Sequence, residues 1–104
     1  MDDTDKRRLL LKFLDERVFR PIVDSPARQG PDAEFFREAQ SRVHRTWARY
    51  PERYQTASAV KHAFLSDLRS PIGRQLAALL EWLGLPRFED VRDDFLRLCD
   101  ELDV

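Results

Sequence analysis

Apolar residues recur every three or four positions along most of this chain, which is the spacing of amphipathic α-helices. The clearest run is Ile72, Leu76, Leu79 and Leu83, whose steps of four, three and four keep one helix face apolar. No segment has the strict alternation typical of half-buried strands, and Val and Ile are scarce. The pattern predicts an all-α fold, a compact bundle of four or five helices.

Prolines, glycines and capping residues set the expected helix boundaries. Pro21 ends or bends the first helix, because proline disfavours helical geometry in the residue before it. Turn-forming residues predict a loop over 22–30. Ser70 followed by Pro71 predicts a capped helix start, and Gly84 predicts a left-handed helix stop. The helices are expected at about 3–21, 31–50, 56–69, 71–83 and 88–102.

The last helix carries a seven-residue apolar repeat, formed by Phe88, Val91, Phe95, Leu98 and Leu102. Two heptads are too short for a free coiled coil but suit an antiparallel seam with the preceding helix. We therefore expect a C-terminal antiparallel helical hairpin. In the second helix the predicted buried positions are Phe35, Ala39, Val43 and Trp47, with Phe36 and Tyr50 beside them. Apolar stripes of this length leave surface for a homodimer, the commonest assembly.

Length and charge narrow the class of protein. A chain of 104 residues predicts a single helical domain spanning 1–104. The net charge of −1 predicts no bulk attraction to nucleic acid or to a membrane. No apolar run approaches the ~20 residues of a membrane span, and an acidic start is unlike a signal peptide. With Cys99 as its single cysteine, the chain is expected to be cytoplasmic.

Residues that support common catalytic or metal chemistry are sparse and scattered. The candidate zinc ligands His44, His62 and Cys99 lack the close pairing of structural zinc sites. No Gly-x-Ser-x-Gly motif or glycine-rich phosphate loop is present. Adjacent carboxylates on a helix point about 100° apart, so we interpret them as solvated or capping groups, and Cys99 as a small core residue. We expect no catalytic residue, no cofactor and no metal, and hence a protein that is not an enzyme.

The strongest candidate for a functional surface is basic. Arg42, Arg45, Arg49 and Arg53 step by three, four and four, with Trp47, Tyr50 and Tyr54 interleaved. Residues 35–62 hold six Lys or Arg against two Asp or Glu, whereas residues 76–104 hold three against eight. Arginines with aromatic side chains are typical of surfaces that bind single-stranded nucleic acid.

Three other interpretations of the four arginines remain open. They could bind an acidic protein surface, they could form an ordinary polar helix face, or they could pair with Asp93, Asp94 and Asp100 of the same chain. The primary prediction is a non-enzymatic helical protein-interaction module or small accessory subunit, with a protein partner or self-association. The alternative is a nucleic-acid-binding protein that uses the arginine-rich helix face.

Overall fold

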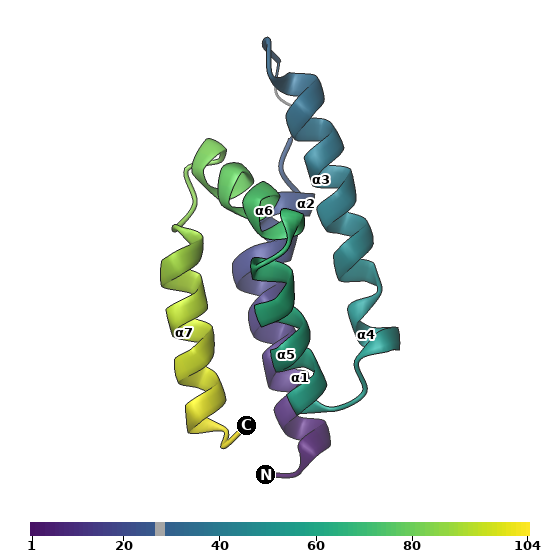
Figure 1. Cartoon of the computed structure of the whole chain (residues 1–104), viewed down its shortest axis with the longest axis vertical. Coiled ribbons are helices and arrows are strands. Elements are labelled where there is room, and N and C mark those ends of the chain that lie inside the picture. The colour runs from purple at the N-terminus through teal and green to yellow at the C-terminus, as the bar shows by residue number, and fades with distance from the viewer. Residues whose placement is uncertain (27–28) are drawn as a thin grey trace.

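A computed structural model of the protein describes residues 1–26 and 29–104, and it is helical throughout the regular structure of that part of the chain. The elements in chain order are α1 (Asp3–Leu14), the π-helical segment η1 (Asp15–Phe19), α2 (Arg20–Val23), α3 (Ala33–Ala48), α4 (Tyr50–Arg53), α5 (Ala57–Leu68), α6 (Pro71–Trp82) and α7 (Phe88–Glu101). Figure 1 shows α1, α5 and α7 side by side, α3 along the opposite flank, and α6 crossing above them. The prediction of an all-α bundle is confirmed.

The sequence predicted that Pro21 ends or bends the first helix, and the structure shows that the helix does not end there. Helical backbone continues from α1 through η1 and α2 to Val23. The widened turn of η1 explains this, because the amide of Arg20 donates to the carbonyl of Asp15, five residues earlier. Proline has no N–H to lose, and the wider turn relieves the clash of its ring with the preceding turn. The predicted loop therefore starts at Asp24, and residues 27 and 28 within it lie outside the described part of the chain.

Side-chain caps fix the starts of α5 and α6, close to where the sequence placed them. The Thr56 hydroxyl accepts a hydrogen bond from the Ala59 amide at 3.0 Å, and the Ser70 hydroxyl accepts one from Ile72 at 3.3 Å. Gly84 ends α6 with φ = 71°, and the next amide, that of Leu85, bonds back to a carbonyl inside α6 at 2.8 Å. The predicted cap and stop are both present.

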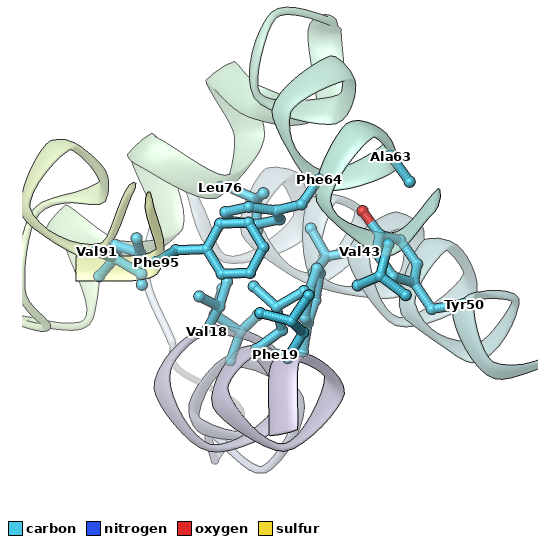
Figure 2. Packing of buried hydrophobic residues seen from close by; sticks show 14 of the residues in the cluster. Val18, Phe19, Val43, Tyr50, Ala63, Phe64, Leu76, Val91 and Phe95 are labelled. Carbon is cyan, nitrogen blue, oxygen red and sulfur yellow. The ribbon is translucent and has the colours of Figure 1, made fainter. Parts of the chain in front are cut away.

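One apolar core joins all the long helices (Figure 2). Its centre is aromatic: Phe19 contacts Tyr50 and Phe64 at ring-centroid distances of 5.8 and 6.4 Å, and Phe64 contacts Phe95 at 4.9 Å. The largest side chains with almost no solvent exposure are Tyr50, Phe19, Phe64, Phe95, Leu10, Leu14, Ile22, Leu76, Leu79, Leu80, Val18 and Val43. Burying these residues supplies the main favourable free energy of folding.

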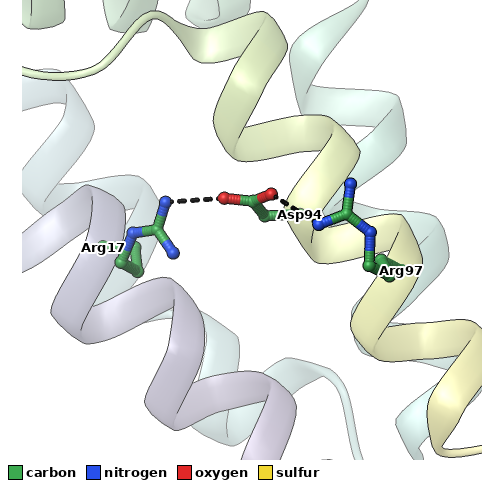
Figure 3. Close-up of polar contacts among 3 residues, drawn as sticks. All are labelled: Arg17, Asp94 and Arg97. Carbon is green, nitrogen blue, oxygen red and sulfur yellow. Dashed lines mark hydrogen bonds and ion pairs between the residues drawn. The ribbon is translucent and has the colours of Figure 1, made fainter.

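The apolar face of α7 packs against a wider set of helices than the predicted seam with α6. Phe95 contacts Phe13 of α1 as well as Phe64 of α5. Asp94, beside it on α7, accepts a hydrogen bond from Arg17 at 2.9 Å and one from Arg97 at 3.2 Å (Figure 3). These contacts hold α7 against the helix that contains α1, on the far side of the molecule from α3 (Figure 1).

The buried face of α3 begins one residue later than predicted. Phe35 is 58% exposed, whereas its neighbour Phe36 stacks on Trp82 of α6 with ring centroids 3.9 Å apart. Ala39 and Val43 are buried as expected. Phe36 lies nearer the centre of this face than Phe35, because each residue turns the helix by about 100°.

The second helix also ends earlier than predicted. Regular helix stops at Ala48, and α4 forms a separate turn with Pro51 in its first turn.

Along residues 1–26 and 29–104, no helix combines the length and apolar character that a membrane span requires.

Candidate interaction surface

Three of the four predicted arginines lie together on the last turns of α3. Arg42, Arg45 and Arg49 are exposed, and with Thr46 and Ile72 they line a shallow hollow of about 190 Å³. Ile72 belongs to the first turn of α6, which places an apolar side chain beside the three guanidinium groups. We call Arg42, Arg45 and Arg49 the arginine row.

Arg53 is separated from the row by a break in the helix. The chain turns at Arg49, and Arg53 then falls at the end of α4. Its positive charge acts on Asp67 of α5, where it opposes the rise in pKa that burial of the carboxyl group causes. The predicted four-residue stripe is therefore a row of three, with Arg53 near a different helix.

The row carries more positive charge than the carboxylates around it neutralise. Arg42 contacts Glu38 at 3.5 Å, and both side chains are at least half exposed. Arg45 and Arg49 form no ion pair with any carboxylate in the described part of the chain. An exposed pair such as Arg42–Glu38 contributes only about 0–1 kcal/mol, so a better acidic partner could displace it.

The hypothesis that the row pairs with the acidic C-terminal helix of the same molecule is wrong. α3 and α7 lie on opposite flanks (Figure 1). Asp94 is engaged by Arg17 and Arg97, and the hydrogen bond from Arg17 is the main reason that the pKa of Asp94 is lowered. Asp93 contacts its neighbour Arg92 at 3.4 Å.

The three aromatic residues predicted beside the arginines face the protein interior. Trp47 stacks on Phe19 with centroids 4.5 Å apart, and its indole N–H donates to Oδ1 of Asp15 at 3.2 Å. Tyr50 is 1% exposed, and Tyr54 is half-buried against it with ring centroids 5.0 Å apart. In this conformation the row offers charge without a free aromatic platform, so base stacking loses its structural basis.

Tyr50 takes part in a buried polar contact. Its hydroxyl donates to Oδ2 of Asp67 at 2.5 Å, which links α4 to α5. Burial raises the pKa of Tyr50, and it also raises the pKa of Asp67 against the opposing effects of the Tyr50 hydrogen bond and the Arg53 charge. We interpret the pair as structural, because Tyr50 is buried as part of the apolar core (Figure 2).

Two apolar residues that the sequence did not single out for binding lie on or beside the same face of α3. Phe35 is seven residues before Arg42 and so lies on nearly the same line of the helix. Ile72 contributes to the hollow from α6. An exposed phenylalanine next to arginines is typical of the residues that anchor protein interfaces. The signal for Phe35 was its seven-residue offset from Arg42.

The described side chains do not assemble a metal centre or a reactive thiol. In residues 1–26 and 29–104, no group of three His, Cys, Asp or Glu lies close enough to share a metal ion. Cys99 is fully buried, and burial is the main cause of its raised pKa. A thiol in that environment is inert.

Comparison with known proteins adds no further constraint. No match is found for this chain among protein-family models, characterised proteins or solved structures. The function is therefore inferred from the fold and from the chemistry of its surface.

Proposed function

We propose that this protein is a non-enzymatic interaction module that binds an acidic protein segment along the exposed face of α3. The observation that carries the proposal is the pair Arg45 and Arg49, two exposed guanidinium groups with no carboxylate partner in the described chain. Arginine is always charged and binds carboxylates through two parallel hydrogen bonds, so it suits this role better than lysine.

The apolar groups beside the row favour a partner that has apolar as well as acidic side chains. Phe35 is more than half exposed on α3, and Ile72 lies among the arginines. Burying such groups supplies the free energy that exposed charge pairs alone do not. A partner helix with Glu or Asp at every third or fourth position and Leu between them would match both features.

Nucleic-acid binding is the second candidate, and the arginine row itself supports it. Three guanidinium groups can contact phosphates, but the inward packing of Trp47 and Tyr50 removes the aromatic residues that would stack on bases. The overall charge of −1 opposes attraction to a polyanion. These features favour the protein partner over the nucleic acid.

Fluorescence anisotropy separates the two candidates. The probes are a labelled peptide of alternating Glu-rich and Leu-rich turns, a labelled single-stranded oligonucleotide and a labelled duplex. Each is titrated at about 20 mM and about 300 mM NaCl, where screening differs strongly. We expect the peptide to retain measurable affinity at the higher salt because part of its interface is apolar. Tighter binding of either nucleic acid than of the peptide would support the second candidate instead.

A further inference from the structure

The outer face of α7 has the charge and spacing that complement the arginine row. Glu89, Asp93 and Asp100 are exposed there, with the exposed Arg97 between the last two, on the side opposite the buried Val91, Phe95 and Cys99. Asp93 and Asp100 are seven residues apart, as are Arg42 and Arg49. At 1.5 Å per residue both separations are about 10 Å, so two acids on one helix can face two arginines on another.

A single molecule cannot make this contact, because α3 and α7 lie on opposite flanks (Figure 1). Each copy therefore presents one basic and one acidic helix face outward. We propose that the acidic segment bound by the arginine row is α7 of a second copy of this chain. This inference rests on the proposed function and names its partner. Contacts of this kind use different surfaces on the two copies, so they join molecules head to tail.

The same alignment brings an apolar side chain to a hollow whose lining is partly apolar. A hollow of about 410 Å³ lies where α6 meets α7, and it is lined by the apolar Ala77, Leu85 and Phe88 together with Gly84 and the charged Glu81, Arg87 and Glu89. Phe35 lies seven residues before Arg42, and the part of this hollow nearest α7, lined by Arg87, Phe88 and Glu89, lies four to six residues before Asp93. With the two helices parallel, Phe35 of one copy reaches the hollow while its Arg42 and Arg49 face the partner copy's acids.

This parallel register also places two like charges opposite each other. That contact tests whether α3 and the partner copy's α7 run parallel or antiparallel. Glu38 is three residues after Phe35, and Glu89 occupies the matching place on α7. Two like charges that face each other across an interface oppose association. The substitution Glu38→Gln should therefore tighten self-association, even though it removes the exposed contact between Glu38 and Arg42. An antiparallel register would not bring these two glutamates together.

Sedimentation velocity over a concentration series, at about 20 mM and about 300 mM NaCl, tests the assembly. We expect the sedimentation coefficient to rise with concentration at low salt, and much less at high salt. The variants R42A/R49A and D93N/D100N should each raise the dissociation constant at least about tenfold. F35A should weaken assembly at both salt concentrations. The matched control E16Q/E52Q removes two exposed negative charges from elements other than α7 and should assemble like the unmodified protein.

Mixing the two charge variants gives the decisive result. R42A/R49A keeps its acidic face and D93N/D100N keeps its arginine row, so an equimolar mixture should form a 1:1 dimer that neither variant forms alone. A mixture that stays monomeric overturns the inference, as does an unmodified protein that stays monomeric at low salt. If the acidic peptide still binds in that case, the proposed function stands and only the identity of the partner is wrong.

Discussion

The hydroxyl of Tyr50 donates a 2.5 Å hydrogen bond to Oδ2 of Asp67, from within a core that leaves Tyr50 only 1% exposed. This contact joins the end of the arginine-bearing segment to α5. It also fixes Tyr50 inside the protein, where Phe19 and Trp47 pack against its ring. The tyrosine that the sequence placed on a binding surface thus helps to position that surface from beneath.

Replacing Tyr50 by Phe should lower the free energy of unfolding by about 1–3 kcal/mol, because the half-buried Asp67 carboxylate loses its donor. Urea denaturation followed by circular dichroism measures the change. Tyr54→Phe is the matched control, since the Tyr54 hydroxyl has no hydrogen bond within the described chain. Equal effects of the two substitutions would contradict the structural role of the Tyr50–Asp67 bond.

The Arg17–Asp94 contact should make the docking of α7 sensitive to acid. The hydrogen bond from Arg17 lowers the pKa of Asp94 below its usual value. The ionised carboxylate therefore stabilises the folded protein fully at pH values above that usual pKa. This stabilisation is lost as the pH falls through the lowered pKa. Asp94→Asn should therefore be less stable than the unmodified protein at pH 7, with the difference disappearing in strong acid. Thermal unfolding over a pH series measures it, and a difference independent of pH would refute this interpretation.

Arg7 should be a main anchor between α1 and the turn after the arginine row. Its guanidinium donates to the backbone carbonyls of Tyr54 and Pro51, both at 2.7 Å. Lysine cannot reproduce this fork, so Arg7→Lys should cost about 1–2 kcal/mol of stability. Arg8→Lys is the control, because Arg8 makes one exposed contact with Asp5. Equally small effects of the two substitutions on urea denaturation would show that Arg7 does not anchor this turn.

Gly73 lies where the start of α6 closely approaches the end of α5. A Cβ atom at this buried position would lie 2.1 Å from the carbonyl oxygen of Leu68, so α5 and α6 would have to move apart. Gly73→Ala should lower the free energy of unfolding by about 1–3 kcal/mol. Arg74→Ala, at an exposed position on the same turn, should change stability by less than about 0.5 kcal/mol. A Gly73→Ala variant as stable as Arg74→Ala would show that the corner is less close-packed than described.

Local signals predicted most of the secondary structure because they act within one turn of the chain. Ser70, Pro71 and Gly84 each satisfy or remove backbone groups at a helix end, so their effects are visible without knowledge of the fold. Of the two outcomes predicted for Pro21, an end or a bend, the end does not occur because the helix type changes at Asp15–Phe19, and no single residue signals that change.

The sequence predicts the exposed arginines of the candidate surface but not the positions of its aromatic residues. Periodicity correctly places Arg42, Arg45 and Arg49 on one exposed face. It cannot tell which aromatic residues of an amphipathic helix are captured by neighbours, because that depends on tertiary contacts. Trp47 is held by Phe19, which is distant in sequence, and Phe35 is left exposed because Phe36 takes the contact with Trp82. The relative placement of α3 and α7 likewise follows only from the assembled fold.

The most direct test of the interaction surface is the affinity of the acidic peptide for two variants of equal charge. R45E/R49E reverses the two unpaired arginines, whereas K12E/R87E makes the same change of charge at exposed positions outside the row. Measured by anisotropy at about 20 mM NaCl, R45E/R49E should lose binding by at least about tenfold while K12E/R87E keeps it. Equal loss in both variants would mean that overall charge, and not the arginine row, governs binding.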